Sequence, residues 1–116
     1  MQRILSYPEA IKEAIVQEMT QNPSVIVLGQ GVDDPKGILG TTKGLVDKFG
    51  SERVFDTPLA EDGMTGVAIG AALAGLRPIH VHIRMDFVLL AMNQLINIAA
   101  KMRYMFGGEV FVPMVV

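Results

Sequence analysis

The amino-acid sequence predicts an α/β domain in which a mainly parallel sheet carries helices on both faces. Helical and strand patterns alternate along the chain, and the predicted strands show little polar alternation, which indicates burial on both sides. Alternating elements of this kind favour right-handed crossovers and therefore parallel neighbouring strands. The length of 116 residues suits one domain, and no repeat or low-complexity linker divides it.

The first half of the chain predicts two helices and two short strands. Ser6, Pro8 and Glu9 form an N-cap pattern, which predicts a helix that ends near Gln21. Residues 25–28 are a continuous apolar run rich in β-branched side chains, which predicts a buried strand. Next we expect a loop, a short helix closed by glycine and a second strand, at residues 29–37, 41–50 and 53–56.

The second half predicts two further helices and two further strands. After a turn at Thr57-Pro58, these elements are a glycine-rich and alanine-rich helix, a strand, a long helix and a final strand, at residues 62–76, 78–83, 87–104 and 110–116. The final strand is apolar to the end of the chain, whereas domain ends usually lie at the surface. We therefore expect an apparently truncated domain, either a fragment or one part of a split polypeptide.

Composition excludes several classes of function. Ten basic and twelve acidic side chains give a formal net charge of −2, which argues against a nucleic-acid partner. The lack of cysteine excludes disulfides, cysteine-ligated metal sites and a thiolate nucleophile. Mean hydropathy is high at +0.38, yet the apolar runs are much shorter than the roughly 20 residues of a membrane span. The chain does not begin like a signal or transit peptide, so we expect a cytoplasmic location.

Glu61 and Phe87 are the candidate site residues at the strand-to-helix junctions. Open parallel sheets bind ligands where strands end and helices begin. Glu61 at such a junction could act as a general acid or base or hydrogen-bond a heterocycle, or it could merely favour the positive end of the helix dipole, together with Asp62. Phe87 could present its ring to a planar ligand from the same sheet edge, or pack into the core.

Two pairs of small or polar residues are candidates for an interface. Gly66 and Gly70 lie four residues apart on one helix face, which favours close approach of another helix over a phosphate-binding loop. That second helix could belong to this domain or to a partner subunit. Asn93 and Asn97 share a face of the long helix, which predicts either an interface network of hydrogen bonds or a solvated stripe.

His80 and His82 lie two residues apart in a predicted strand, so their side chains leave the same face. Two histidines could share a metal ion, but no third ligand stands at a diagnostic spacing. We therefore favour a polar lining of a cleft or interface and predict no metal site in this chain.

Six segments of the chain together resemble the β subunit of the E1 component of 2-oxo acid dehydrogenases, of the pyruvate, branched-chain and acetoin types. In one order along nearly the whole chain, these segments are residues 27–32, 43–50, 53–61, 70–78, 85–87 and 99–104. Transketolase and deoxyxylulose-phosphate synthase share the fold, but their counterparts of residues 85–87 and of the helix that follows read differently. The E1 β resemblance is therefore preferred.

This resemblance implies that residues 1–116 are part of the pyrimidine-binding domain of a thiamine-diphosphate enzyme that oxidatively decarboxylates a 2-oxo acid. It implies that Glu61 hydrogen-bonds N1′ of the aminopyrimidine ring and activates the cofactor, and that Phe87 stacks on that ring. Gln30 is implied as a cofactor contact, although the family commonly has an acidic residue there and another where this chain has Val81. Gln30 can donate and accept a hydrogen bond but supplies no charge.

The resemblance also implies partners. The Gly-Asp-Gly…Asn pattern that holds magnesium and diphosphate is absent from this sequence and belongs to the α subunit in the family. We therefore expect an α-type partner, self-association of β subunits in a heterotetramer, an E2 acyltransferase as a further partner, and an inactive isolated chain. Two alternatives stay open: a non-catalytic interaction module of the same fold, which the changes at Gln30 and Val81 allow, and a transketolase-like enzyme acting on sugar phosphates.

Overall fold

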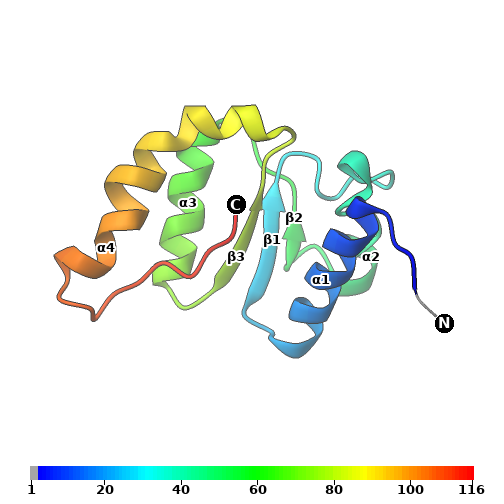
Figure 1. The fold of residues 1–116 in the computed structure, drawn as a ribbon, viewed down its shortest axis with the longest axis horizontal. Coiled ribbons are helices and arrows are strands. Elements are labelled where there is room, and N and C mark those ends of the chain that lie inside the picture. Colours follow the sequence, from blue (N-terminus) through cyan, green and yellow to red (C-terminus); the bar gives the residue numbers. More distant parts are fainter. Residues whose placement is uncertain (1–2) are drawn as a thin grey trace.

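A computed structural model describes residues 3–116 and confirms the α/β fold (Figure 1). Three parallel strands form one sheet in the order β2-β1-β3, and their bounds are Val25–Gly29 for β1, Val54–Phe55 for β2 and Arg77–Val81 for β3. Pairing between β1 and β3 extends from Val25 opposite Arg77 to Gly29 opposite Val81. β1 is therefore the central strand of this sheet.

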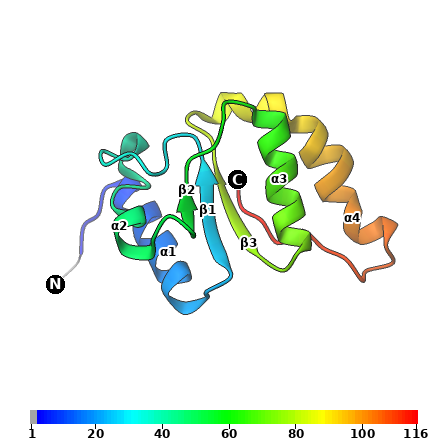
Figure 2. The ribbon, with the colours of Figure 1, turned by 180° about the vertical axis from the view of Figure 1, so that it is seen from behind.

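Helices cover both faces of the sheet, as predicted (Figures 1 and 2). The helices are α1 (Tyr7–Gln21) and α2 (Leu45–Phe49) on one face and α3 (Glu61–Leu73) on the other. Side chains of β1 enter the two cores alternately, because successive residues of a strand point to opposite faces. Val25 and Val27 pack in the core that includes α1 and α2, whereas Ile26 and Leu28 pack against Ala68 of α3.

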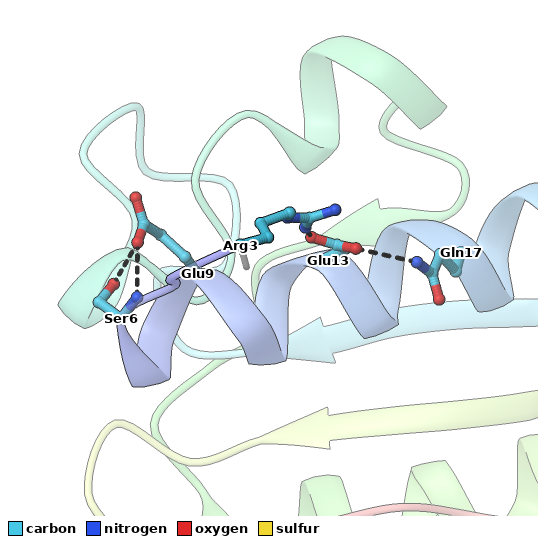
Figure 3. A network of polar contacts seen from close by, with 5 residues as sticks. All are labelled: Arg3, Ser6, Glu9, Glu13 and Gln17. Carbon is cyan, nitrogen blue, oxygen red and sulfur yellow. Dashed lines mark hydrogen bonds and ion pairs between the residues drawn. The ribbon is translucent and has the colours of Figure 1, made fainter. Parts of the chain in front are cut away.

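The predicted capping pattern at the start of α1 is confirmed (Figure 3). The backbone N–H and the hydroxyl of Ser6 both donate to Oε2 of Glu9, at 2.8 and 2.6 Å. These hydrogen bonds, the hydroxyl bond foremost, hold the pKa of Glu9 below its ordinary value. Arg3 forms an ion pair with Glu13, which also accepts a hydrogen bond from Gln17 at 3.1 Å.

The long helix predicted at residues 87–104 is helical but mostly not α-helical. Its hydrogen-bond pattern changes along the chain, from a 3₁₀ segment at Met85–Ala91 to a π segment at Asn93–Ala99 and then to α4 at Ala100–Met105. Near the start of the π segment, Gln94 lies against Gly66 of α3 and donates to Oδ2 of Asp62 at 3.3 Å. The segment therefore departs from α-helical hydrogen bonding where it packs on α3, and the helical periodicity of the sequence does not predict this departure.

The prediction of a strand over residues 110–116 is wrong in its length. Within it, only Val115 forms a bridge, parallel to Ile79, through one hydrogen bond to Pro78 at 2.9 Å and one from His80 at 2.8 Å. Proline has no N–H to donate at position 113, and the next N–H, that of Met114, is used in a local turn to Val112 O. This last segment ends beside β3, on the side opposite β1 (Figures 1 and 2).

Within residues 3–116, no helix combines the length and the apolar character that crossing a membrane requires.

Candidate functional site

The carboxyl ends of the three strands meet at one edge of the sheet, where the chain departs toward opposite faces. The loop after β1 leads to the face covered by α1, which the 3₁₀ turn at Ile38–Gly40 contacts. The helical segment after β3 packs instead on α3. A crevice between diverging connections of this kind is the usual ligand site of an open parallel sheet.

Gly29 lets β1 and β3 approach closely at this edge. It stands opposite Val81, and a Cβ atom added to Gly29 would lie 2.1 Å from the carbonyl oxygen of Val81. Gly29 also has a φ of +150°, which side chains disfavour. The next residues along the two strands, Gln30 and His82, therefore leave the sheet side by side.

A second contact ties β2 to the same edge. The carboxylate of Asp56, which follows β2, accepts a hydrogen bond from the backbone N–H of Gly31 at 2.6 Å. The end of β2 and the loop after β1 are thereby held together, and the connection from β2 to α3 starts from a fixed point.

A small pocket, with about 10 Å³ of space open to the centre of a water molecule, lies at this edge and gathers the predicted polar residues. Its polar side chains include Gln30, Glu61, His80 and His82. Pro58, Ala60 and Met64 are among its apolar walls. The sequence separates Gln30 from Glu61 by a helix and a strand, and the structure brings both to one cavity.

Glu61 is the first residue of α3 and lies on the side that faces the sheet. Thr65, Ala68 and Ala72 follow it at helical spacing, and all three are buried. Glu61 is partly buried and lines the pocket, whereas the neighbouring Asp62 is exposed and accepts the hydrogen bond from Gln94. The two acidic residues at this helix start therefore have different environments, and only Glu61 faces the cavity.

His80 forms a buried link between β3 and α3. Its Nδ1 lies 3.4 Å from the carbonyl oxygen of Leu28 and its Nε2 lies 3.1 Å from Oγ1 of Thr65. A carbonyl can only accept, so Nδ1 carries the proton and Nε2 accepts from the Thr65 hydroxyl. Burial lowers the pKa of His80, and the neighbouring His82 lowers it further. His80 is thus a neutral histidine whose two ring nitrogens are both used.

His82 lies next to His80 but has no such partners. The two rings meet edge to face, with centroids 4.7 Å apart and an interplanar angle of 65°. Nε2 of His82 is shielded from water and has no hydrogen-bond partner among the described residues. Burial lowers the pKa of His82, while the negative charge of Glu61 acts in the opposite direction. Within residues 3–116, no three side chains of the metal-binding types gather into a site.

Phe87, the predicted stacking residue, lies at the start of the helical segment after β3 and is half-buried. Phe87 is not among the described residues that line the Glu61 pocket. The guanidinium group of Arg84 lies 5.2 Å from the centre of its ring, and Arg84 is itself held by an ion pair with Asp86. One face of the Phe87 ring is therefore occupied by a cation.

Gly66 and Gly70, the predicted interface glycines, differ in their surroundings. A Cβ atom on Gly66 would lie 3.4 Å from Oε1 of Gln94, so Gly66 accommodates the helical segment of its own chain. A Cβ atom on Gly70 would have no atom within 4 Å from any described residue beyond its own stretch of helix. Gly66 therefore serves packing within the domain, and Gly70 leaves open surface.

Asn93 and Asn97 form an exposed polar ladder. Asn97 donates to Oδ1 of Asn93 at 3.0 Å and accepts from Nζ of Lys101 at 2.9 Å. Large apolar side chains are also exposed on this helical segment, at Leu89, Leu90, Ile96, Tyr104, Met105 and Phe106. In this single chain the ladder is a solvated stripe within a surface that is otherwise rich in apolar groups.

Sequence reasoning missed the role of Thr65 and understated that of His82. Thr65 follows Glu61 by one helical turn, and this spacing was the available signal for a polar residue on the same buried face. His82 was expected to line a cleft, which it does, but the unpartnered state of its Nε2 depends on three-dimensional packing.

Comparison with known proteins gives matches over almost the whole chain. Residues 4–116 match a family model described as the transketolase pyrimidine-binding domain. The chain is 49% identical, over 126 aligned positions, to the beta subunit of acetoin:2,6-dichlorophenolindophenol oxidoreductase from Cupriavidus necator. This alignment covers 100% of this chain and 37% of that protein.

Mitochondrial plant proteins give similar matches. Identity is 45% over 107 positions to pyruvate dehydrogenase E1 component subunit beta-2 of Oryza sativa subsp. japonica, covering 92% of this chain and 28% of that protein. Identity to pyruvate dehydrogenase E1 component subunit beta-1 of Arabidopsis thaliana is 44% over 107 positions, and the alignment covers 92% of this chain and 30% of that protein. The chain thus spans about a third of the length of the curated relatives it matches.

Proposed function

We propose that the pocket of this chain holds the aminopyrimidine ring of thiamine diphosphate. The chain belongs to the transketolase pyrimidine-binding domain family, and the proposal proceeds from this membership. The matches also confirm the resemblance to E1 β subunits. The observation that carries the proposal is the position of Glu61, which enters a pocket at the carboxyl edge of the sheet from the sheet-facing side of α3. The proposed whole enzyme is a 2-oxo acid dehydrogenase with this chain in its β subunit.

The residues of the pocket fit one end of such a ring. An aminopyrimidine offers both hydrogen-bond donors and acceptors on a flat apolar body. The pocket provides a carboxyl group from Glu61, an amide from Gln30 and apolar walls from Pro58 and Met64. Nε2 of His82 is a further buried polar atom, and no described residue supplies a hydrogen-bond partner for it.

Each residue has a defined task in this proposal. Glu61 hydrogen-bonds a ring nitrogen and holds or releases a proton at its carboxyl oxygens. Gln30 orients the ring through its amide and adds no charge, and Phe87 supplies an aromatic face at the same sheet edge. The apolar walls limit the access of water to Glu61. When bound, thiamine diphosphate supplies the electron sink for loss of carbon dioxide from a 2-oxo acid.

The proposal requires a partner subunit. The Gly-Asp-Gly…Asn pattern belongs to the α subunit in the family that this chain resembles, so we assign the diphosphate and magnesium half of the site to an α-type subunit. Gly70, Asn93 and Asn97 remain on the surface and are proposed interface residues, with Gly66 supporting the helix packing behind them. The exposed apolar side chains of the same helical segment support burial against another subunit. Self-association of β subunits and docking of an E2 acyltransferase complete the proposed assembly.

The decisive experiment replaces the carboxyl group of Glu61. The complete β subunit would be assembled with its α partner, and turnover would be measured with 2-oxo acids, acetoin and sugar phosphates. We expect Glu61→Gln to lower kcat for the 2-oxo acid about 100-fold or more, because a positioned proton-transfer group contributes about 10² to 10⁴. Glu52→Gln changes an exposed glutamate on a turn away from the pocket and is the matched control.

Each other outcome has a clear meaning. Normal turnover by Glu61→Gln contradicts the assignment of Glu61. Turnover of sugar phosphates instead of 2-oxo acids supports the transketolase-like alternative. An assembled wild-type complex that turns over none of these compounds supports the non-catalytic module. The isolated chain is expected to show no measurable affinity for thiamine diphosphate, because it carries only half of the proposed site.

A further inference from the structure

His82 carries a buried polar atom that the fold leaves without a partner. Its Nε2 is shielded from water and forms no hydrogen bond with any described residue, although the side chain lines the Glu61 pocket. Native proteins satisfy the great majority of buried polar atoms, because an unpaired one loses its hydration without compensation. Such an atom in a side chain that lines a pocket is a candidate contact for a bound molecule.

The neighbours of His82 cannot supply the partner. Both ring nitrogens of His80 are already engaged, one with Leu28 and the other with Thr65. Glu61 acts on His82 through its charge, but no hydrogen bond joins the two side chains. Pro58, Ala60, Met64 and Val81 in the pocket wall have apolar side chains. The pocket also contains Gln30 and Thr57, but neither forms a hydrogen bond to Nε2, which is therefore left for a molecule that enters the pocket.

His82 is also held in place, as a binding residue must be. It follows Val81, whose position at the end of β3 is fixed by the close pairing with Gly29. Its ring meets the ring of His80 edge to face, and His80 is held between β1 and α3 by its two hydrogen bonds. The orientation of the His82 ring is therefore set before any ligand binds, which reduces the entropy lost on binding.

We propose that His82 is a further binding residue of the pocket, and that its Nε2 hydrogen-bonds to the nitrogen heterocycle held by Glu61. The class of ligand is a flat heteroaromatic ring with donors and acceptors on its rim, matching a carboxyl group, an amide and an imidazole on one side. That this ring belongs to thiamine diphosphate rests on the proposed function. His82 thus adds a contact to those made by Glu61 and Gln30.

The charge state of the ring decides how binding depends on pH. The titratable groups that face His82 are Glu61 from α3, His80 from β3 and Glu18 from α1 across an adjoining groove. Burial is the main influence and lowers the pKa of His82, so the ring is neutral at pH 7. Acidification protonates it, and a buried cation then disfavours the same hydrogen-bonded complex.

The test measures binding of thiamine diphosphate to the assembled complex of β and α subunits by calorimetry, from pH 8 to about pH 5. His82→Phe keeps a flat ring without nitrogen atoms, and we expect affinity at pH 7 to fall about tenfold, as for one lost hydrogen bond. His82→Gln places a non-titrating amide near the former Nε2 and should stay within about threefold of wild type. Ile83→Ala, at the next residue and outside the pocket lining, is the control.

The pH series gives a readout independent of turnover. As pH falls, wild type should lose affinity relative to His82→Gln, because only wild type protonates a ring at this position. Equal affinity of His82→Phe and wild type, or a wild-type to His82→Gln ratio that is constant with pH, overturns the inference. If His82→Phe fails to assemble, the His82→Gln series decides alone.

Failure of the proposed function gives a different pattern. A wild-type complex that does not bind thiamine diphosphate, or that binds it equally well with Glu61→Gln, contradicts the proposed function and this inference with it. Tight binding that depends on Glu61 but not on His82 contradicts this inference alone.

Discussion

The hydrogen bond between Thr65 and His80 joins the helix that carries Glu61 to the sheet beneath it. Both residues are buried, with exposed fractions of 0% and 3%. Thr65 lies one helical turn after Glu61, so this bond fixes the rotation of α3 about its axis close to the pocket. The direction of the Glu61 side chain therefore depends on a polar contact in the core.

Replacement of the Thr65 hydroxyl tests this link. Thr65→Val keeps the shape of the side chain but leaves Nε2 of His80 without its donor, so we expect the free energy of unfolding to fall by about 1–3 kcal/mol. Urea unfolding measures the change. Thr20→Val is the control, because its hydroxyl donates to Val16 O on the exposed side of α1 and its loss should cost less than about 0.5 kcal/mol. Equal effects at the two positions would contradict a special role for Thr65.

At the residue scale, sequence reasoning predicted positions better than contacts. Glu61 could be singled out because strand ends and helix starts are readable from sequence, whereas Gln30 was implied only by the family resemblance; the structure places both in one pocket. The bond between Thr65 and His80 depends on how α3 is rotated over β3, which linear spacing does not specify. Whether Phe87 stacks on a ligand stays a prediction.

At the element scale, the close pairing of β1 with β3 shapes the pocket edge. The two strands pair along five positions, and Gly29 closes this ladder opposite Val81. A side chain at Gly29 would collide with the Val81 carbonyl, so the approach of the two strands depends on a glycine there. Gln30 and His82 keep their relative positions only while this pairing holds.

Gly29→Ala is therefore expected to be strongly destabilising. The Cβ atom of the alanine would lie 2.1 Å from the backbone oxygen of Val81, and the alanine itself would have to adopt an unfavourable φ. We therefore expect a loss of about 3 kcal/mol in the free energy of unfolding. Gly50→Ala is matched for backbone strain alone, because Gly50 has a φ of +81° but open space around its Cβ position. Its loss in the same urea titration should reflect backbone strain alone, about 1–2 kcal/mol, and stay below that of Gly29→Ala. A smaller loss at Gly29 than at Gly50 would refute the steric account.

Elements in the first half of the chain follow the sequence more closely than those in the second half. The start of α1 and the course of β1 have strong local signals, namely a capping pattern and a β-branched apolar run. The 3₁₀ and π segments between Met85 and Ala99 arise where the helical segment packs on α3, and the final apolar run is kept from pairing further by Pro113. Both differences come from tertiary contacts or from a missing donor.

At the scale of the whole molecule, the high apolar content is only partly buried within the chain. Two cores lie on opposite faces of the sheet, yet many large apolar side chains on the helical segment after β3 remain exposed. Contiguous exposed apolar surface is typical of interaction sites. The exposed apolar side chains therefore support the proposed subunit interface at the Asn93 and Asn97 ladder. The chain also spans only about a third of the length of its relatives.

The two histidines also predict how the stability of the whole molecule depends on pH. Burial lowers the pKa of both His80 and His82 in the folded state below the ordinary value of 6.5. Below pH 6.5 the unfolded chain therefore binds more protons than the folded chain, and the free energy of unfolding falls as the pH falls. His80 contributes at most about 1.4 kcal/mol per pH unit, and His82, which is less buried, contributes less.

Urea unfolding at a series of pH values from about 7.5 to 5 measures this slope. His82→Phe should make the slope shallower without abolishing it, because His80 still titrates. Glu9 acts in a separate window: its pKa is lowered in the folded state, so its contribution is present above the ordinary value of 4.5 and disappears at more acid pH. Glu9→Gln should therefore leave the slope between pH 7 and about 5.5 unchanged. Stability that rises as the pH falls through this range would show that the folded chain favours the charged histidines, contrary to their burial beside the pocket.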